Sequence, residues 1–309
     1  MPCFATFYRN ITGCFALALL LMPCACGGSA SAPPAPPALP AFTTLTGPPR
    51  DSERFLNKKY LSRLPYNFQV PADDDELGWR VLADYGSVYA AQGGVIPPPT
   101  VQFANEAETA AWQAGLAIER FDFGEEKYGN FVELQARAMT AYKEAREEVE
   151  TIGLSLTPRG SDAGRRSFEA TVKLWQNGLK PGFEHWLNAK RLTNQEVERL
   201  RALPPAEQVR EILRLEAQGL FFGKDFDKSI LATISAPGTS QHLSLLALDL
   251  YEYENYDVRL ILARHGWYQT IPADLPHFTY LGVREGQLPT LGLKRIIRSE
   301  RAFWVPDVK

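Results

Sequence analysis

The chain has 309 residues, 45% of them hydrophobic and 11% aromatic, which is enough to bury the core of one large domain or of two modest ones. Its net charge is −3 and it has no basic stripe with interleaved aromatic residues, so we expect no nucleic-acid partner. It contains no internal repeat and no His-Glu-x-x-His, Gly-x-Ser-x-Gly or phosphate-binding loop, so nothing supports the enzyme classes that carry those motifs.

Residues 1–26 have the layout of a secretory signal peptide. Arg9 supplies the positive charge, Phe15–Met22 form a short apolar run, and small residues follow. The run is shorter than the ~20 residues of a membrane-spanning helix. All four cysteines lie in this segment, and Leu-Met-Pro-Cys-Ala-Cys resembles a bacterial lipoprotein processing site. We expect a lipid anchor on Cys26; an ordinary cleaved signal is the alternative.

Residues 27–50 are dominated by Pro, Ala, Ser and Gly. Such a composition builds no core and favours extended polyproline conformations. At ~3.1 Å per residue the segment reaches up to roughly 70 Å. We expect a tether between the anchor and the folded part.

Residues 51–150 give mixed signals and contain no chemical motif. Residues 81–90 indicate a strand or hairpin arm, and residues 106–118 indicate a helix. Apolar residues recur every three or four positions from Phe131 to Val149, which predicts a long amphipathic helix. We expect an N-terminal extension that packs on the core of a domain formed by residues 151–309.

Between residues 160 and 219 the sequence indicates a helical segment. Phe168, Val172 and Trp175 follow helical spacing. Thr193-x-x-Glu196 is a capping box that opens a second helix, and residues 206–218 predict a third. We expect these helices to be scaffold.

Two short segments, 237–250 and 274–280, hold two of the four histidines of the chain, His242 and His277. They also hold Asp249 and Asp274. Two histidines and a carboxylate form a recurrent ligand set for catalytic zinc, which takes three protein ligands and leaves a fourth position for water. The two segments therefore predict a zinc site.

The spacing of His242 and Asp249 restricts how they can share a metal. In one helix, seven residues at about 1.5 Å each would separate them by roughly 10 Å, too far for zinc bonds of about 2.0–2.2 Å. In an unbroken strand an odd separation puts them on opposite faces. His242 must therefore lie on a loop or bend, and Asp249 on the strand that follows.

The surrounding pattern agrees with that arrangement. Pro237-Gly-Thr-Ser240 is typical of a turn, and Leu246, Leu248 and Leu250 alternate with Ala, Asp and Tyr as in a strand. Residues 257–265 predict a helix, and residues 267–270 and 277–281 predict short strands. Residues 294–309 form a basic, aromatic tail.

Ser240-x-His242-x-x-Leu245-x-Ala247-x-Asp249 resembles the Ser-x-His-x-x-Gly-x-Ala-x-Asp motif of zinc D-alanyl-D-alanine peptidases of the VanY type. Asp274-x-x-His277 resembles the carboxylate-x-x-His signature that closes the same site. The resemblance covers roughly residues 150–282. It implies that His242, Asp249 and His277 bind Zn²⁺ and that Asp274 is the general base.

The same resemblance extends to Arg166, because Gly164-Arg-Arg-Ser167 is similar to the Gly-Tyr-Arg-Ser segment of that family. It implies that the planar guanidinium holds a substrate oxygen; an exposed arginine near a helix start is the alternative. The chain departs from the family at Leu245, where the motif has Gly, and at Thr171, which stands about where the family has a Gln.

The expected fold is α+β, a small, largely antiparallel sheet with helices packed to one side, as in the hedgehog and D,D-peptidase fold that the resemblance implies. The expected activity is zinc-dependent hydrolysis of peptidoglycan stem peptides, by a D,D-carboxypeptidase or an L-alanyl-D-glutamate endopeptidase, in the cell envelope. The alternative is a non-catalytic peptidoglycan-binding or interaction lipoprotein that keeps the fold. Nothing in the sequence indicates an oligomeric state.

Overall fold

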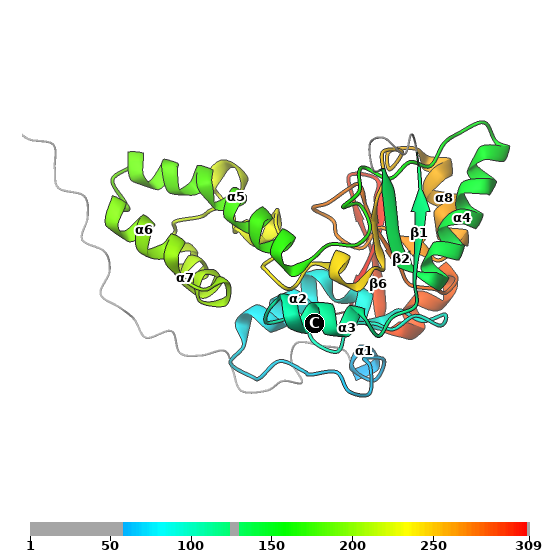
Figure 1. Ribbon diagram of the computed structural model, residues 1–309, viewed down its shortest axis with the longest axis horizontal. Helices are drawn as coiled ribbons and strands as arrows, with labels where there is room; N and C mark the ends of the chain where they lie inside the picture. The colour runs from blue at the N-terminus through cyan, green and yellow to red at the C-terminus, as the bar shows by residue number, and fades with distance from the viewer. Residues whose placement is uncertain (1–57, 124–129, 308–309) are drawn as a thin grey trace, which may run out of the picture. The chain divides into compact units, whose positions relative to one another are not determined.

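The structure is a computed structural model that describes residues 58–123 and 130–307 (Figure 1). These belong to residues 47–309, one of the two units into which the chain divides. The predicted signal peptide 1–26 with Cys26 and the predicted tether 27–50 lie outside the described residues. Among the helices that are described, none combines the length and the apolar character needed to cross a membrane.

The described elements alternate between helices, short strands and 3-10 turns. The α-helices are α1 (Lys58–Leu61), α2 (Glu76–Tyr85), α3 (Glu106–Gln113), α4 (Ala136–Thr151), α5 (Phe168–Asn188), α6 (Asn194–Ala202), α7 (Pro205–Ala217) and α8 (Tyr256–Arg264). The strands are β1 (Ile118–Asp122), β2 (Phe131–Gln135), β3 (Ala247–Asp249), β4 (Trp267–Tyr268), β5 (His277–Tyr280), β6 (Leu293–Arg298) and β7 (Arg301–Pro306). The 3-10 helices are η2 (Gly86–Ala90), η4 (Lys224–Phe226), η5 (Ile230–Ala232), η6 (Gln241–Ser244) and η7 (Glu285–Leu291).

The strands form small antiparallel sheets, which confirms the α+β prediction. Within the described residues, β1 pairs with β2, β6 pairs with β7, and β3, β5 and β4 form a three-stranded sheet in that order. Helices α4 and α8 lie beside one another next to the strands (Figure 1). The three-stranded sheet carries two of the predicted metal ligands.

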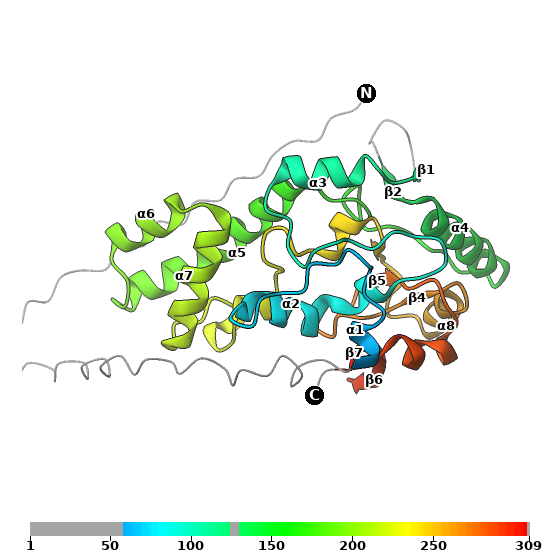
Figure 2. The same cartoon turned by 90° about the horizontal axis from the view of Figure 1, so that it is seen from below.

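One hydrophobic core joins the N-terminal helices to this sheet. It takes buried side chains from α2, η2, β2 and α4 and packs them against β3, α8, β4 and β5. Residues 51–150 and 151–309 both contribute to it, and the division of the chain near residue 150 stays a prediction. A second core lies within residues 168–236, which hold α5, α6, α7, η4 and η5 and are called the α5–α7 segment below; its buried residues run from Trp175 to Ala236. Figures 1 and 2 show α5, α6 and α7 packed together.

Several predicted elements are confirmed with their caps. Helix α6 begins at the predicted capping box, in which Thr193 and Glu196 bond each other's backbone N–H groups. Helix α8 is capped by Asn255, and Gly266 follows it with a positive φ of 81°. The basic, aromatic tail is the β6–β7 hairpin, and the Trp304 N–H donates to the Gln269 carbonyl.

Two predictions in the N-terminal part are wrong. Residues 81–90 form the end of α2 and the turn η2 rather than a strand, because Asp75 caps the helix and Val81, Leu82 and Tyr85 share its buried face. The helix expected from Phe131 begins at Ala136 instead, because residues 131–135 pair with β1 as strand β2. Apolar spacing alone does not reveal that strand, since its partner lies earlier in the chain.

Candidate metal centre

The three predicted metal ligands come from η6, β3 and β5. His242 lies on the 3-10 turn η6, Asp249 ends strand β3, and His277 begins strand β5. Asp249 and His277 are direct partners in the antiparallel register, which brings their side chains together on one face of the sheet. His242 therefore lies on a bend and Asp249 on the following strand, as the spacing requires.

These side chains converge on one point. One ligand atom from each of His242, Asp249 and His277 can be chosen so that all lie within 4.8 Å of one another. Asp249 Oδ1 is 3.3 Å from His242 Nε2 and 3.2 Å from His277 Nδ1. The two rings meet edge to face, with centroids 4.8 Å apart. Both histidines are buried, and each is only 2% exposed.

When the rings are neutral, the hydrogen bonds behind them leave the converging nitrogens without protons. His242 Nδ1 is 2.9 Å from the Gly164 carbonyl, which can only accept, so Nδ1 carries the hydrogen. His277 Nε2 is 2.9 Å from Gln241 Oε1, another acceptor, so that nitrogen donates. In the neutral rings, His242 Nε2 and His277 Nδ1 are then lone pairs that face Asp249. Three electron pairs meet where a cation fits.

The electrostatic surroundings favour a neutral His242 and an ionised Asp249. Burial, and then the positive charge of Arg166, lowers the pKa of His242, against the opposing effect of Asp249. Burial raises the pKa of Asp249, but the charges and hydrogen bonds that His242 and His277 supply when their rings are protonated outweigh it and hold the pKa below its usual range. The imidazole of His242 is thus neutral and the carboxylate of Asp249 ionised at neutral pH.

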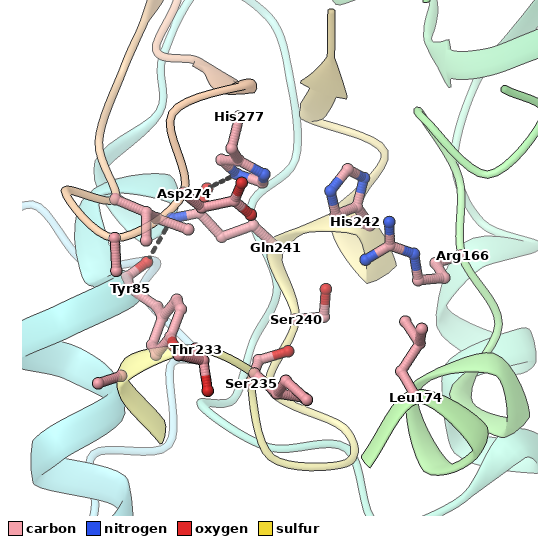
Figure 3. A pocket seen from close by; sticks show the side chains of 14 residues that line it. Tyr85, Arg166, Leu174, Thr233, Ser235, Ser240, Gln241, His242, Asp274 and His277 are labelled. Carbon is pink, nitrogen blue, oxygen red and sulfur yellow. Dashed lines mark hydrogen bonds between the residues drawn. The ribbon is translucent and has the colours of Figure 1, made fainter. Parts of the chain in front are cut away.

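Arg166 and Asp274 line the same pocket as the two histidines. The pocket has a volume of about 190 Å³. In Figure 3, His242 and Arg166 lie together on one side of it, and His277 and Asp274 lie on the other. The Asp274 carbonyl accepts from the His277 N–H at 3.3 Å, which ties the two residues into one turn.

Arg166 also contacts the ligand set directly. Its Nη2 atom is 3.4 Å from Asp249 Oδ2, and its backbone N–H donates to the His242 carbonyl at 3.2 Å. Its Nε atom is buried and has no hydrogen-bond partner among the described residues. The arginine therefore neutralises part of the Asp249 charge and keeps an unused donor.

Leu245 follows η6 in a left-handed backbone conformation, with φ 56° and ψ 25°. This is the position at which the resembled motif has Gly, a residue that adopts positive φ without a steric penalty. Leu245 therefore adopts a conformation that glycine adopts freely, although its side chain carries a Cβ. Its carbonyl accepts from the Gln135 N–H at 3.1 Å, and its side chain is fully buried.

Three glutamines that the sequence analysis did not single out hold the η6 turn. Gln113 donates to the Leu243 carbonyl at 2.9 Å, and Gln135 donates to the Ser244 carbonyl at 2.8 Å. Gln241 contacts His277, as described above. Gln241 could have been noticed as a polar residue beside His242, whereas nothing local marks Gln113 and Gln135, which lie more than 100 residues earlier in the chain.

The other two histidines lie away from this site. His185 stacks on Phe226, with ring centroids 4.1 Å apart, within the α5–α7 segment. His265 is the C-cap residue of α8, and its Nε2 atom lies 2.8 Å from Glu148 Oε2. Thr171, at the position of the family's Gln, donates to the Phe168 carbonyl and accepts from the Gly238 N–H.

No protein-family model and no curated protein matches the chain. Among solved structures, it is similar to a mutant of the vancomycin resistance D,D-pentapeptidase VanY from a VanB-type resistance cassette, in complex with Zn(II). The TM-score is 0.31 and the sequence identity 14%, over 55% of this chain and 82% of that chain. This is a distant resemblance.

Proposed function

We propose that this chain is a zinc-dependent peptidase that hydrolyses peptidoglycan stem peptides. The observation that supports the metal best is the convergence of His242 Nε2, His277 Nδ1 and the Asp249 carboxylate. Two imidazole nitrogens and one carboxylate suit zinc, with bonds of about 2.0–2.2 Å and a fourth position left for water or substrate. The peptidase activity and its substrate rest on the resemblance of the two motifs.

Zinc held by His242, Asp249 and His277 would act as a Lewis acid that polarises a scissile carbonyl and would lower the pKa of a water molecule toward about 7. Asp274, in the same pocket, accepts the proton of the attacking water and returns it to the leaving amine. Arg166 donates from its guanidinium to the substrate oxygen as negative charge develops there. Its place in the lining of the pocket supports that role.

The experiment that tests this function is mass spectrometry of muropeptides after incubation with the zinc-loaded protein. We expect shortened stem peptides. Loss of the terminal D-alanine would identify a D,D-carboxypeptidase, and a cut between L-alanine and D-glutamate would identify an endopeptidase. The matched control is His265→Ala, which removes a histidine remote from the pocket and should cleave like the wild type.

A non-catalytic peptidoglycan-binding protein is the second candidate, because Leu245 and Thr171 depart from the motif. Muropeptides that stay intact with the zinc-loaded protein, yet bind to it, would contradict the peptidase and favour this alternative.

We further propose that the protein acts in the cell envelope, in the periplasm or outside the cell, held to a membrane by a lipid on Cys26. The proposal rests on cysteines confined to the first 26 residues and on the processing-site pattern around them. Metabolic labelling with a palmitate analogue should mark the wild type and not Cys26→Ser. Label that remains on the Cys26→Ser variant would contradict an anchor on Cys26, and the anchor would then be on Cys24 or absent.

A further inference from the structure

Gln241 lies beside the ligand His242 and is itself buried, with 3% of its surface exposed. Both the oxygen and the nitrogen of its side-chain amide form hydrogen bonds. Oε1 accepts from His277 Nε2 at 2.9 Å and from the Thr279 hydroxyl, whereas Nε2 donates to the Tyr85 carbonyl at 2.7 Å and faces Thr270 Oγ1 at 3.5 Å. All the hydrogen-bonding capacity of the amide is therefore used inside the protein.

The Tyr85 carbonyl decides which way the amide points. A carbonyl oxygen can only accept, so the NH₂ group of Gln241 must face it. If the amide were flipped, Gln241 Oε1 would face the Tyr85 carbonyl oxygen, and two acceptors would lie against each other. Thr270 and Thr279 agree with this orientation, because their hydroxyls lie 2.7 Å apart. The donors then run in one direction, from Gln241 Nε2 to Thr270, from Thr270 to Thr279, and from Thr279 back to Gln241 Oε1.

The amide in turn decides the tautomer of His277. Because Oε1 only accepts, His277 must donate from Nε2, and in the neutral ring the Nδ1 atom is then the lone pair, 3.2 Å from Asp249 Oδ1. Without Gln241, the Asp249 carboxylate would be the one acceptor left beside the ring nitrogens among the described residues. The hydrogen would then move to Nδ1, where it would block a metal.

We propose that Gln241 is a positioning residue for the metal centre, which fixes His277 as the Nε2–H tautomer through the Tyr85 carbonyl. Tyr85 ends helix α2, so the N-terminal part of the chain takes part in setting up the site. The effect on metal binding rests on the proposed zinc site. The tautomer itself is a property of the metal-free protein and can be measured separately.

The test is long-range ¹H–¹⁵N NMR of the imidazoles in the metal-free protein, combined with zinc titration against a chromophoric chelator. The chain has four histidines, so each can be assigned by single substitution. We expect His277 of the wild type to be protonated on Nε2. In Gln241→Met, which keeps the length but removes the amide, we expect the hydrogen on Nδ1 and zinc bound about 10–100-fold more weakly, the usual effect of losing such a partner.

Two further variants separate positioning from mere packing. Gln241→Glu loses the donor to the Tyr85 carbonyl but keeps an acceptor for His277, so a folded variant should keep the Nε2–H tautomer. Thr270→Val alters the same buried network without touching His277 and should leave the tautomer and the zinc affinity unchanged.

Protonation of His277 on Nδ1 in the wild type would overturn the proposal even if no variant folds. So would a folded Gln241→Met protein with the wild-type tautomer and zinc affinity. A wild type with the Nε2–H tautomer that binds no zinc would instead overturn the zinc site and leave the role of Gln241 in fixing His277 supported.

Discussion

Leu245 joins the turn that carries His242 to strand β3 with φ at 56°. A residue with a Cβ pays about 1–2 kcal/mol for the left-handed region. The buried leucine side chain offsets this, since its contacts are worth about 2–5 kcal/mol relative to alanine. The position keeps the backbone geometry of a glycine and gains the packing of a leucine.

Substitution of Leu245 tests this balance. Leu245→Ala should lower the free energy of unfolding by about 2–5 kcal/mol. Leu245→Gly loses the same contacts but escapes the left-handed strain, so we expect it to be more stable than Leu245→Ala by about 0.5–1 kcal/mol. Urea denaturation measures both. A glycine variant that is less stable than the alanine variant would show that the backbone is not left-handed here.

Asp274 is expected to move protons without holding the metal. Asp274→Asn keeps the shape and removes the basic oxygen, so hydrolysis of stem peptide should fall by about 10²–10⁴-fold while the zinc content stays near normal. Asp274→Glu should keep partial activity. Turnover at the wild-type rate in Asp274→Asn would make the residue a bystander, and loss of zinc would make it a ligand.

At this scale the three converging side chains could be predicted, because a motif and the odd spacing from His242 to Asp249 both restrict their placement. The roles of Arg166 and Asp274 stay predictions. The positioning partners could not be predicted, because the Gln241 amide bonds the carbonyl of Tyr85, 156 residues away. Every residue has a backbone carbonyl, so the residue type does not show which carbonyl accepts this hydrogen bond.

The α5–α7 segment is the element that separates Arg166 from the η6 turn along the chain. Helix α5 packs against the Phe222 ring later in the same segment. A Cβ atom at Gly182 of α5 would lie 2.4 Å from that ring, so only glycine permits the contact. The last part of the segment, Ala232 to Ser235, lines the metal-site pocket together with Leu174. We infer that the position of these pocket-lining residues depends on the stable folding of this segment.

Glu216 of α7 is the residue that best tests this element. Its Oε1 atom accepts from the backbone N–H groups of Phe222 and Ile230, at 3.1 and 2.7 Å, and so closes the loop that leads to the pocket wall. Glu216→Ala leaves two buried donors unpaired and should lower the free energy of unfolding by about 2–5 kcal/mol. Glu216→Gln keeps the acceptor and should lose less than half as much in urea denaturation. Equal losses in both variants would contradict this role.

Helices with local signals were the predictable elements. The Thr193–Glu196 capping box and the Asn255 cap with Gly266 mark α6 and α8 in the sequence itself. Strand β2 and the turn η2 were missed because apolar spacing alone shows neither a strand's pairing nor how a turn packs into the core. The β1 pairing fixes the first, and the second packs into a core that also takes side chains from α8 and β5.

For the described part of the molecule as a whole, stability should depend on pH through His242. Its folded pKa is lowered, so below the unfolded value of about 6.5 the unfolded chain binds a proton that the folded site refuses. The contribution of His242 to the stability of the metal-free protein is therefore fully present above that pH and is lost as the pH falls. We expect a lower free energy of unfolding at pH 5 than at pH 7, with a smaller difference in His242→Gln. Equal differences in the two proteins would contradict the buried, neutral histidine.

Zinc bound only by the folded state should raise the stability of the wild type. At a free concentration one hundred times the dissociation constant, the gain is about 2.7 kcal/mol. It should vanish with a chelator and be absent from His242→Ala.

The most direct measurement is elemental analysis of the purified wild type beside His242→Ala, His277→Ala and the control His265→Ala. A site made by His242, Asp249 and His277 predicts a single zinc ion per chain in the wild type and in His265→Ala, and its loss from the other two variants. Equal zinc in the wild type and in His242→Ala would contradict the site.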